Sequence, residues 1–208
     1  MSRLVYLRHA QKEYNNGDAD LYKHDPGITS SGVERTKMVT QHLIKSWGEP
    51  DMIITSPYRR CRETAIIMSQ VITKKLEIVK DSSLSEYLGN HRNVPIDVTS
   101  ETKLHDPPHP ESFTEMKKRV DDHFKRVSKY TKHNKGDIKI IWFITHGLIL
   151  KQVAEIIGLK MNKNRLPTLT CLSIIEEDRV TKGEVLLFRD DEELSNSYDK
   201  SMIEAESV

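Results

Sequence analysis

Short apolar runs alternate along the chain with longer stretches in which apolar residues recur at helical spacing. The runs predict buried strands over about Leu4 to Leu7, Met52 to Thr55, Leu76 to Val79 and Ile138 to Thr145. The last of these contains the most hydrophobic segment of the chain, as expected for a central parallel strand that is buried on both faces. Strands that alternate with helices predict an α/β fold: a three-layer α/β/α sandwich with a mostly parallel sheet.

Helix boundaries are indicated by capping residues. Thr29 is a predicted N-cap for a helix that Gly48 and Pro50 end, and Ser56-Pro57 supplies an N-cap and a first-turn proline for the next helix. Ser112 with Glu115 forms a capping box before a long amphipathic helix. A fourth helix begins near Leu148 and is closed by Gly158.

The C-terminal part differs in pattern. Residues 171–175 and 185–188 predict a hairpin-like pair that adds an antiparallel edge strand to the sheet. From Asp190 the chain is acidic and serine-rich with little periodicity, so we expect a single domain over residues 1–189 and a disordered tail over residues 190–208. The polar stretches 11–28 and 87–110 are long enough to be functional loops that line a pocket mouth.

Composition excludes several classes of function. Lys and Arg number 32 against 31 for Asp and Glu, which leaves a net charge of +1 and no global basic field for nucleic acid. No apolar run approaches the ~20 residues that span a bilayer. The two cysteines, Cys61 and Cys171, suggest neither a disulfide framework nor a metal site, so a cytoplasmic setting is expected. Oligomeric state stays open.

Three strand ends carry the candidate chemistry. Arg8-His9 follows the first strand, Arg60 lies shortly after the second, and His146-Gly147 follows the most apolar one. The carboxyl ends of parallel strands share one edge, so two imidazoles and at least two guanidiniums are expected to converge there. Guanidinium forks match phosphate oxygens, and helix N-termini add donors. The predicted ligand is a phosphate monoester.

These residues resemble the signatures of the histidine phosphatase (phosphoglycerate-mutase-like) superfamily. The first is Arg-His-Gly-x-x-x-x-Asn, where this chain has Ala10 in place of the glycine. Five elements match in the family's order, between residue 4 and about residue 150: Leu7-Arg8-His9-Ala10 with Asn15, Ile28-Thr29-Ser30-Ser31-Gly32, Ser56 to Ala65, Glu111-Ser112 with Arg119-Val120, and Thr145-His146-Gly147.

The resemblance implies that His9 is the nucleophile that becomes a phosphohistidine, while Arg8, Arg60 and a protonated His146 hold the phosphoryl oxygens. It also implies binding roles for Asn15 and Gly147, and it requires neither a metal nor another cofactor. The physical reading agrees, because a neutral imidazole is nucleophilic when its other nitrogen donates its hydrogen to a backbone carbonyl.

The proton donor for the leaving group is expected on the loop after the third strand. Glu86 is the first choice, because Leu84-Ser85-Glu86 followed by Gly89 resembles the family's Leu-x-Glu…Gly pattern, and Asp81 is the alternative. His105 and His109 near Asp106 fit a solvated loop better than a metal site, because their spacing is irregular and no cysteine accompanies them.

The predicted activity is hydrolysis of phosphomonoesters on a phosphorylated small molecule or a phosphopeptide. Mutase-type phosphoryl transfer is an alternative, although the segment Asn90 to Asn93 carries only a modest positive charge for retaining a bisphosphorylated intermediate. A non-catalytic phosphate-binding adaptor is a third possibility, which has no need for a nucleophile or an acid.

Overall fold

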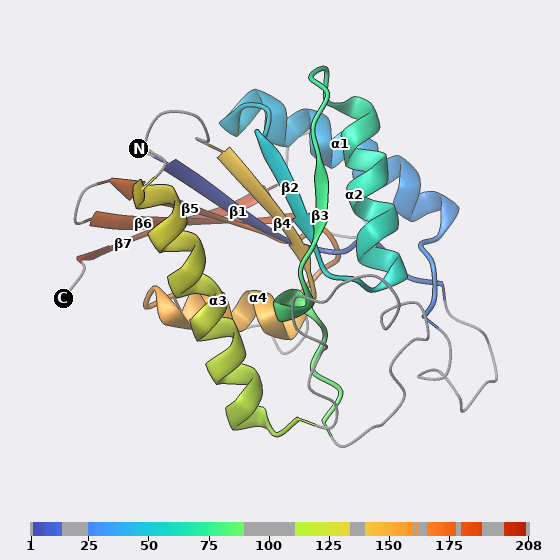
Figure 1. The fold of residues 1–208 in the computed structure, drawn as a ribbon. Helices are drawn as coiled ribbons and strands as arrows, with labels where there is room; N and C mark the ends of the chain where they lie inside the picture. Colours follow the sequence, from blue (N-terminus) through green and yellow to red (C-terminus); the bar gives the residue numbers. More distant parts are fainter. Residues whose placement is uncertain are drawn as a thin grey trace.

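The computed structural model describes residues 2–13, 25–89, 111–133, 140–159, 161, 166–177, 180–188 and 198–206. They form a seven-stranded sheet in the order β3-β2-β4-β1-β5-β6-β7, with helices on both faces (Figure 1). The elements are β1 (Ser2–Arg8), α1 (Ser30–Trp47), β2 (Met52–Thr55), α2 (Arg59–Val71), β3 (Ile78–Lys80), the 3-10 turn η1 (Ser82–Leu84), α3 (Phe113–His133), β4 (Ile140–Thr145), α4 (Gly147–Ile156), β5 (Cys171–Glu177), β6 (Val180–Phe188) and β7 (Tyr198–Glu206). The predicted α/β/α architecture is confirmed.

The parallel half of the sheet contains β3, β2, β4 and β1. β4 lies between β2 and β1, and its residues from Ile141 to Thr145 are buried. The strongly apolar segment therefore forms an inner strand, as predicted. The third strand begins later than expected, at Ile78.

Alternating residues of the strands enter two separate cores. Val5 and Leu7 of β1 belong to the cluster that includes residues of α1 and α2, whereas Leu4 and Tyr6 belong to the cluster with α3 and α4. This two-residue period is the normal consequence of a pleated strand, whose successive side chains point to opposite faces. Figure 1 shows α1 and α2 on one face and α3 and α4 on the other.

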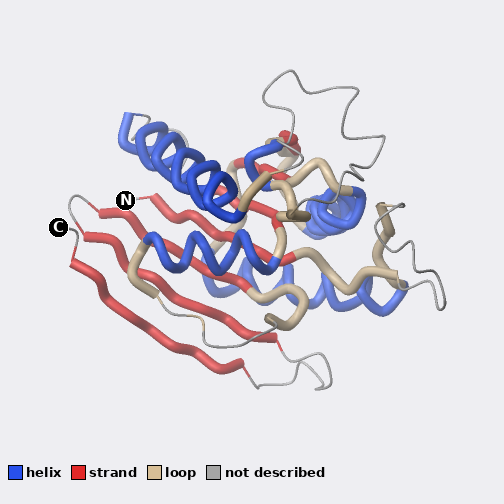
Figure 2. The backbone as a smooth tube through the Cα atoms, turned by 90° about the horizontal axis from the view of Figure 1, so that it is seen from below, coloured by secondary structure: helices blue, strands red, loops and turns tan. Residues whose placement is uncertain are grey.

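The antiparallel half is larger than predicted. β5 pairs antiparallel with β1, and β6 and β7 follow antiparallel, so that β7 is the edge strand, which Figure 2 shows in red beyond the helices. The expectation of disorder after residue 190 is wrong for residues 198–206, because this segment is β7. The strand is formed by backbone hydrogen bonds along the whole of β6. Such pairing cannot be predicted from composition or periodicity, because it does not depend on the side chains of the segment.

Two of the predicted caps are confirmed and one is wrong. The Thr29 hydroxyl accepts from the Gly32 amide at 3.0 Å, and Ser112 and Glu115 bond reciprocally in a capping box. Helix α2, however, begins at Arg59 and not at Pro57, and its N-cap Tyr58 makes no side-chain cap. The Asp25 carboxylate accepts from the Arg59 amide instead, so a distant residue satisfies this helix end.

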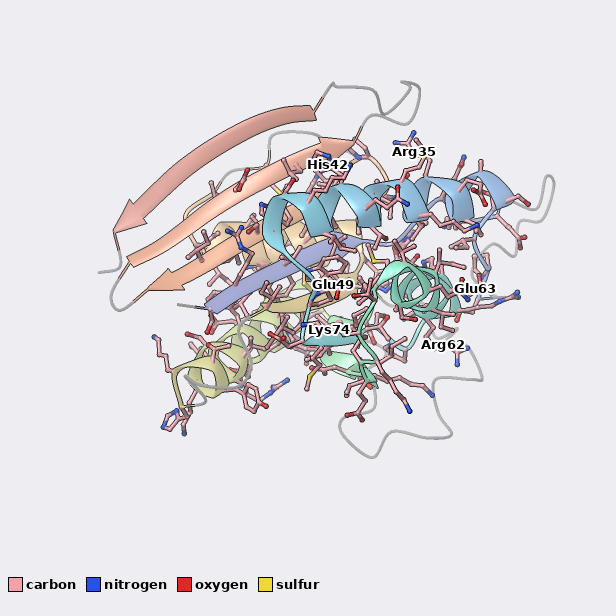
Figure 3. All side chains as sticks on the ribbon, turned by 90° about the horizontal axis from the view of Figure 1, so that it is seen from above. Arg35, His42, Glu49, Arg62, Glu63 and Lys74 are labelled. Carbon is pink, nitrogen blue, oxygen red and sulfur yellow. The ribbon has the colours of Figure 1, made fainter. Side chains whose placement is uncertain are left out.

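The other ends of α1 and α2 also lie together (Figure 3). Glu49, just beyond α1, accepts from the amide and hydroxyl of Thr73, just beyond α2, and Lys74 pairs with Asp51 at 2.7 Å. These contacts fix the two helices against each other at the end that is remote from Arg59.

Both cysteines are buried and unpaired, and burial raises the pKa of each thiol. Cys61 packs in the core next to His146, as expected for a small apolar residue and not for a reactive thiol. Among the helices that the structure describes, none has the length and apolar character needed to cross a membrane.

Candidate active site

The backbone at the carboxyl ends of the parallel strands places the predicted site residues side by side. The amide of His9 donates to the Thr145 carbonyl, and that of Ser56 donates to the Ile144 carbonyl, both at 2.9 Å. The sheet hydrogen bonding thus continues one residue beyond β1 and β2 along β4. It brings His9 and Ser56 next to His146, which follows β4 directly.

His9 is buried, with 3% of its surface exposed. Its Nδ1 lies 2.7 Å from the carbonyl oxygen of Ala10. Because a carbonyl only accepts, Nδ1 carries the hydrogen, and the lone pair of a neutral ring lies on Nε2. Burial, together with the charge of Arg60, holds the pKa of His9 well below its usual value of 6.5. The imidazole is therefore neutral at physiological pH, with one defined tautomer.

His146 is the second buried imidazole, and its ring centre lies 5.4 Å from that of His9. Arg60 Nη2 lies 3.2 Å from His146 Nδ1, and Ser56 Oγ lies 2.9 Å from Nε2. A guanidinium only donates, so Nδ1 is the acceptor and Nε2 of the neutral ring donates to Ser56. Burial and the charge of Arg60 lower the pKa of His146 well below 6.5, so the ring is neutral in the free protein. The protonated His146 expected from the sequence concerns the state with a phosphoryl group bound.

Arg60 is the cation at the centre of the site. Its side chain is only 4% exposed, and its guanidinium pairs with Asp25 Oδ1 at 3.1 Å and with Glu86 Oε2. The same group lies 4.6 Å from the centre of the Tyr58 ring. A buried guanidinium needs anionic partners, and here two carboxylates supply them. Oxyanions of a phosphoryl group match the same donors.

Of the remaining predicted binding residues, the structure describes Arg8 and Gly147 but not Asn15. Arg8 donates from Nη1 to the Leu166 carbonyl and packs against Gly147, where a Cβ would lie 3.5 Å from Arg8 Nε. Arg8 thus flanks the two histidines, and its charge contributes to lowering the pKa of both. Asn15 lies outside the described residues, as do the segment 90–93, His105 and His109.

The two candidate acids have different surroundings. Glu86 is one-third exposed, contacts Arg60, and has Oε2 3.9 Å from His146 Nδ1. Asp81 instead caps η1, accepts from the amide and hydroxyl of Ser83, and pairs with His123 at 3.2 Å. Burial alone would raise the pKa of Asp81, but the bonds from His123 and Ser83 hold it below its ordinary value. Of these two acids, only Glu86 has a contact with Arg60 or His146 that the structure describes.

Sequence reasoning missed three residues of this site. Asp25 was expected only as part of a polar loop, and Ser56 only as a helix cap. Tyr58, whose ring lies 5.0 Å from that of His146, lies within the matched segment Ser56 to Ala65 but was given no role there. Nothing in the local sequence around Asp25 shows that it reaches Arg60.

A cavity of about 600 Å³ lies beside α2, lined by Thr55, Arg59, Arg62, Glu63, Ile66, Ile78 and Lys80. It includes none of the predicted site residues. Arg59, whose side chain is 54% exposed, pairs with Glu63 at 2.7 Å. Arg62, which Figure 3 labels beside Glu63, is partly buried.

The fold is that of the histidine phosphatase superfamily. The model of the histidine phosphatase superfamily (branch 1) matches residues 4–190, so the chain belongs to that superfamily.

Its relatives include both phosphatases and mutases. The chain is 30% identical over 131 residues to "Putative phosphoserine phosphatase 2" of Hydrogenobacter thermophilus, covering 58% of this chain and 64% of that protein. It is 30% identical over 84 residues to a 2,3-bisphosphoglycerate-dependent phosphoglycerate mutase of Parvibaculum lavamentivorans, covering 40% of each. The matched region thus spans less than two thirds of these curated relatives.

Solved structures share the fold. The ecdysone phosphate phosphatase of Bombyx mori, in complex with tungstate, superposes with a TM-score of 0.67 at 16% identity, covering 96% of this chain and 98% of that one. The phosphoglycerate mutase of Bacillus anthracis gives 0.66 at 16% identity, covering 86% and 90%. Members of the superfamily are phosphatases or mutases, and the particular activity of this chain is a separate question.

Proposed function

We propose that this protein is a phosphatase that hydrolyses phosphomonoesters through a phosphohistidine on His9. The observation that carries the proposal is the state of His9: Nδ1–H bonds to the Ala10 carbonyl, and the low pKa keeps Nε2 unprotonated beside Arg60. A nucleophile of this kind needs no separate base. An adaptor that only bound phosphate would gain nothing from it.

In the first step, His9 Nε2 attacks phosphorus in line with the ester oxygen. The N–P bond forms, the P–O bond to the leaving group breaks, and the leaving oxygen takes a proton from the Glu86 carboxyl. Arg60, flanked by Arg8 and the amides at the start of α4, stabilises the charge on the equatorial oxygens, which is the main requirement of phosphoryl transfer.

Substrate must first displace the carboxylates that pair with Arg60. A dianionic phosphate takes the guanidinium from Glu86, and the anion also favours a protonated His146. That proton is acquired with the substrate, because His146 is neutral in the free protein. Asp81 is the poorer donor, because its carboxylate is committed to Ser83 and His123.

In the second step, water attacks the phosphohistidine while the Glu86 carboxylate accepts its proton. The N–P bond breaks, its electrons return to Nε2, and inorganic phosphate leaves. This cycle uses no metal or other cofactor, and the two buried, unpaired cysteines are compatible with the reducing cytoplasm.

The substrate class that we propose is a phosphorylated small molecule or phosphopeptide. L-phosphoserine is the first metabolite to test, because a relative at 30% identity bears the name of a phosphoserine phosphatase. Neither nucleic acid nor membrane is needed as a partner.

The test is phosphate release from a panel of metabolites and phosphopeptides in the presence of a chelator, ranked by kcat/KM. Quenching in alkaline denaturant during turnover should trap on the wild type a phosphoryl group that is stable in base and lost in acid, and none on His9→Ala. Interconversion of 3-phosphoglycerate and 2-phosphoglycerate without net phosphate release would instead establish a mutase.

A further inference from the structure

A buried polar cluster connects α3 with the turn that carries Glu86. His123 of α3 is 1% exposed, and its Nδ1 lies 2.8 Å from Ser83 Oγ and 3.2 Å from Asp81 Oδ2. Its other nitrogen, Nε2, lies 3.2 Å from the hydroxyl of Tyr6. Every polar atom of the ring therefore has a partner.

This cluster is unsuited to nucleophilic catalysis. In a Ser-His-Asp relay, serine and aspartate bond to opposite nitrogens of the imidazole. Here Ser83 and Asp81 share Nδ1, and Ser83 is 3% exposed. The contacts instead join α3 to η1.

Arg119 makes a second connection one helical turn before His123, on the same face of α3. Its Nη1 donates to the carbonyl oxygens of Ser83 at 2.7 Å and Ser85 at 3.2 Å. The buried carboxylate of Glu111 binds the other two nitrogens of the guanidinium and fixes its plane. Such bidentate pairing holds the fork in one orientation.

The turn is thus held at three consecutive carbonyls. Arg119 binds those of Ser83 and Ser85, and Thr145 Oγ1 donates to that of Leu84 at 2.8 Å. The next residue is Glu86, whose carboxylate contacts Arg60 and approaches His146.

We propose that Arg119 and His123 are positioning residues that hold η1 so that the Glu86 carboxyl lies within reach of the leaving-group oxygen. The inference rests on the proposed function, in which Glu86 is the proton donor. Neither residue contacts the phosphate-site residues His9, Arg60 or His146 through a bond that the structure describes, so their effect passes through the turn. A displacement of about 1 Å in a catalytic group can cost on the order of 10²-fold in rate.

The test uses two substrates that differ in their need for a proton. L-phosphoserine leaves as an alkoxide that must be protonated, whereas 2,4-dinitrophenyl phosphate leaves as a stable phenolate. Loss of a general acid costs roughly 10²–10⁴-fold, and only for the first kind of substrate. The comparison uses kcat/KM, which reports phosphoryl transfer to His9 and not the later hydrolysis, where Glu86 acts as base for both substrates. Glu86→Gln is the reference variant and should lower kcat/KM for phosphoserine by about 10²-fold or more, with little change for the dinitrophenyl ester.

His123→Leu should show the same selectivity at a smaller scale: kcat/KM should fall about tenfold for phosphoserine and less than about twofold for the dinitrophenyl ester. His123→Asn should restore part of the loss, because its amide nitrogen can replace Nδ1 towards Ser83. Arg119→Lys, which keeps the positive charge opposite Glu111 but cannot bridge both carbonyls, should also be selective. Val127→Ala on the same helix is the control for a general loss of stability.

If Glu86→Gln is selective and the folded His123 and Arg119 variants lose both activities equally, the positioning role is wrong and the proposed function stands. If Glu86→Gln itself is not selective, the acid step fails and the inference fails with it. Should His123→Leu not fold, Arg119→Lys decides by the same comparison.

Discussion

The proposed phosphate pocket (His9, Arg60 and His146) and the turn that carries the proposed acid (Ser82–Glu86, the acid turn) meet at Arg60 but are held by different kinds of bond. The backbone amide of His9 bonds to the residue that precedes His146, so the sheet itself sets the spacing of the two imidazoles. In the described residues, a comparable bond joins only the residue before the acid turn to the sheet, from the Asp81 amide to the Thr55 carbonyl. Side chains of α3 and β4 hold the carbonyls of the turn and Ser83.

The difference indicates where each half is vulnerable. Backbone ladders persist when side chains change, so substitutions in the pocket should remove chemical groups without moving the others. A hydrogen bond made by a side chain is lost when that side chain is mutated, so substitutions of the residues that bind the acid turn should move Glu86. In kcat/KM, which reports the first step, pocket variants should therefore impair every ester, and acid-turn variants only esters with poor leaving groups.

The largest effect is expected from His9→Ala, which removes the nucleophile. Turnover should fall by on the order of 10⁴-fold or more for phosphoserine and dinitrophenyl phosphate alike. Vanadate binding, measured by calorimetry, should persist because Arg60 remains. His133→Ala, an exposed histidine on α3, is the matched control. Unchanged turnover would remove His9 from the mechanism.

Arg60→Ala should follow, with a loss in kcat/KM of about 10²–10³-fold on both substrates, because a buried donor to the phosphoryl oxygens is removed. Asp25 and Glu86 then lose their shared cation, so the melting temperature should be measured as well. Arg59→Ala, the exposed neighbour on the same helix, should retain nearly full activity. Equal losses in the two variants would contradict a special role for Arg60.

Ser56→Ala tests the tautomer of His146. Without the hydroxyl, the Nε2 hydrogen has no acceptor at Ser56, which costs about 1–2 kcal/mol and roughly tenfold in kcat. The loss should again be independent of the leaving group. Ser69→Ala, an exposed serine of α2, provides the comparison. A loss confined to phosphoserine would place Ser56 with the acid turn instead.

The smallest change is expected between pH 7 and pH 6. Because the pKa of free His9 lies well below 6.5, kcat/KM should fall less than about twofold over this interval. The lowered pKa values of His9 and His146 also make stability depend on pH. Below about pH 6.5 the unfolded chain binds more protons than the folded one, so the free energy of unfolding decreases on acidification. The rate prediction is checked by measuring kcat/KM from pH 5 to 8, and the stability prediction by urea unfolding over the same range. A fall in kcat/KM with a midpoint at or above pH 6.5 would contradict the neutral His9.

The elements with a strong local signal were predicted correctly. The Thr29 cap, the Ser112–Glu115 box and the inner strand β4 each follow from residues that are close in the sequence. The cap of α2 was not predicted because its acceptor, Asp25, is 34 residues away from Arg59. The edge strand β7 was missed because its partner is the backbone of β6 and its composition is that of a tail.

The sequence by itself determined the layered fold and the meeting of His9, Arg60 and His146, because hydrophobic period and the common edge of parallel strands follow from residue order. Only the tertiary structure decided the states of these groups. Burial makes both imidazoles neutral, single contacts define their tautomers, and two carboxylates from separate loops neutralise Arg60. Such properties depend on distance and desolvation, which arise only when remote segments pack together.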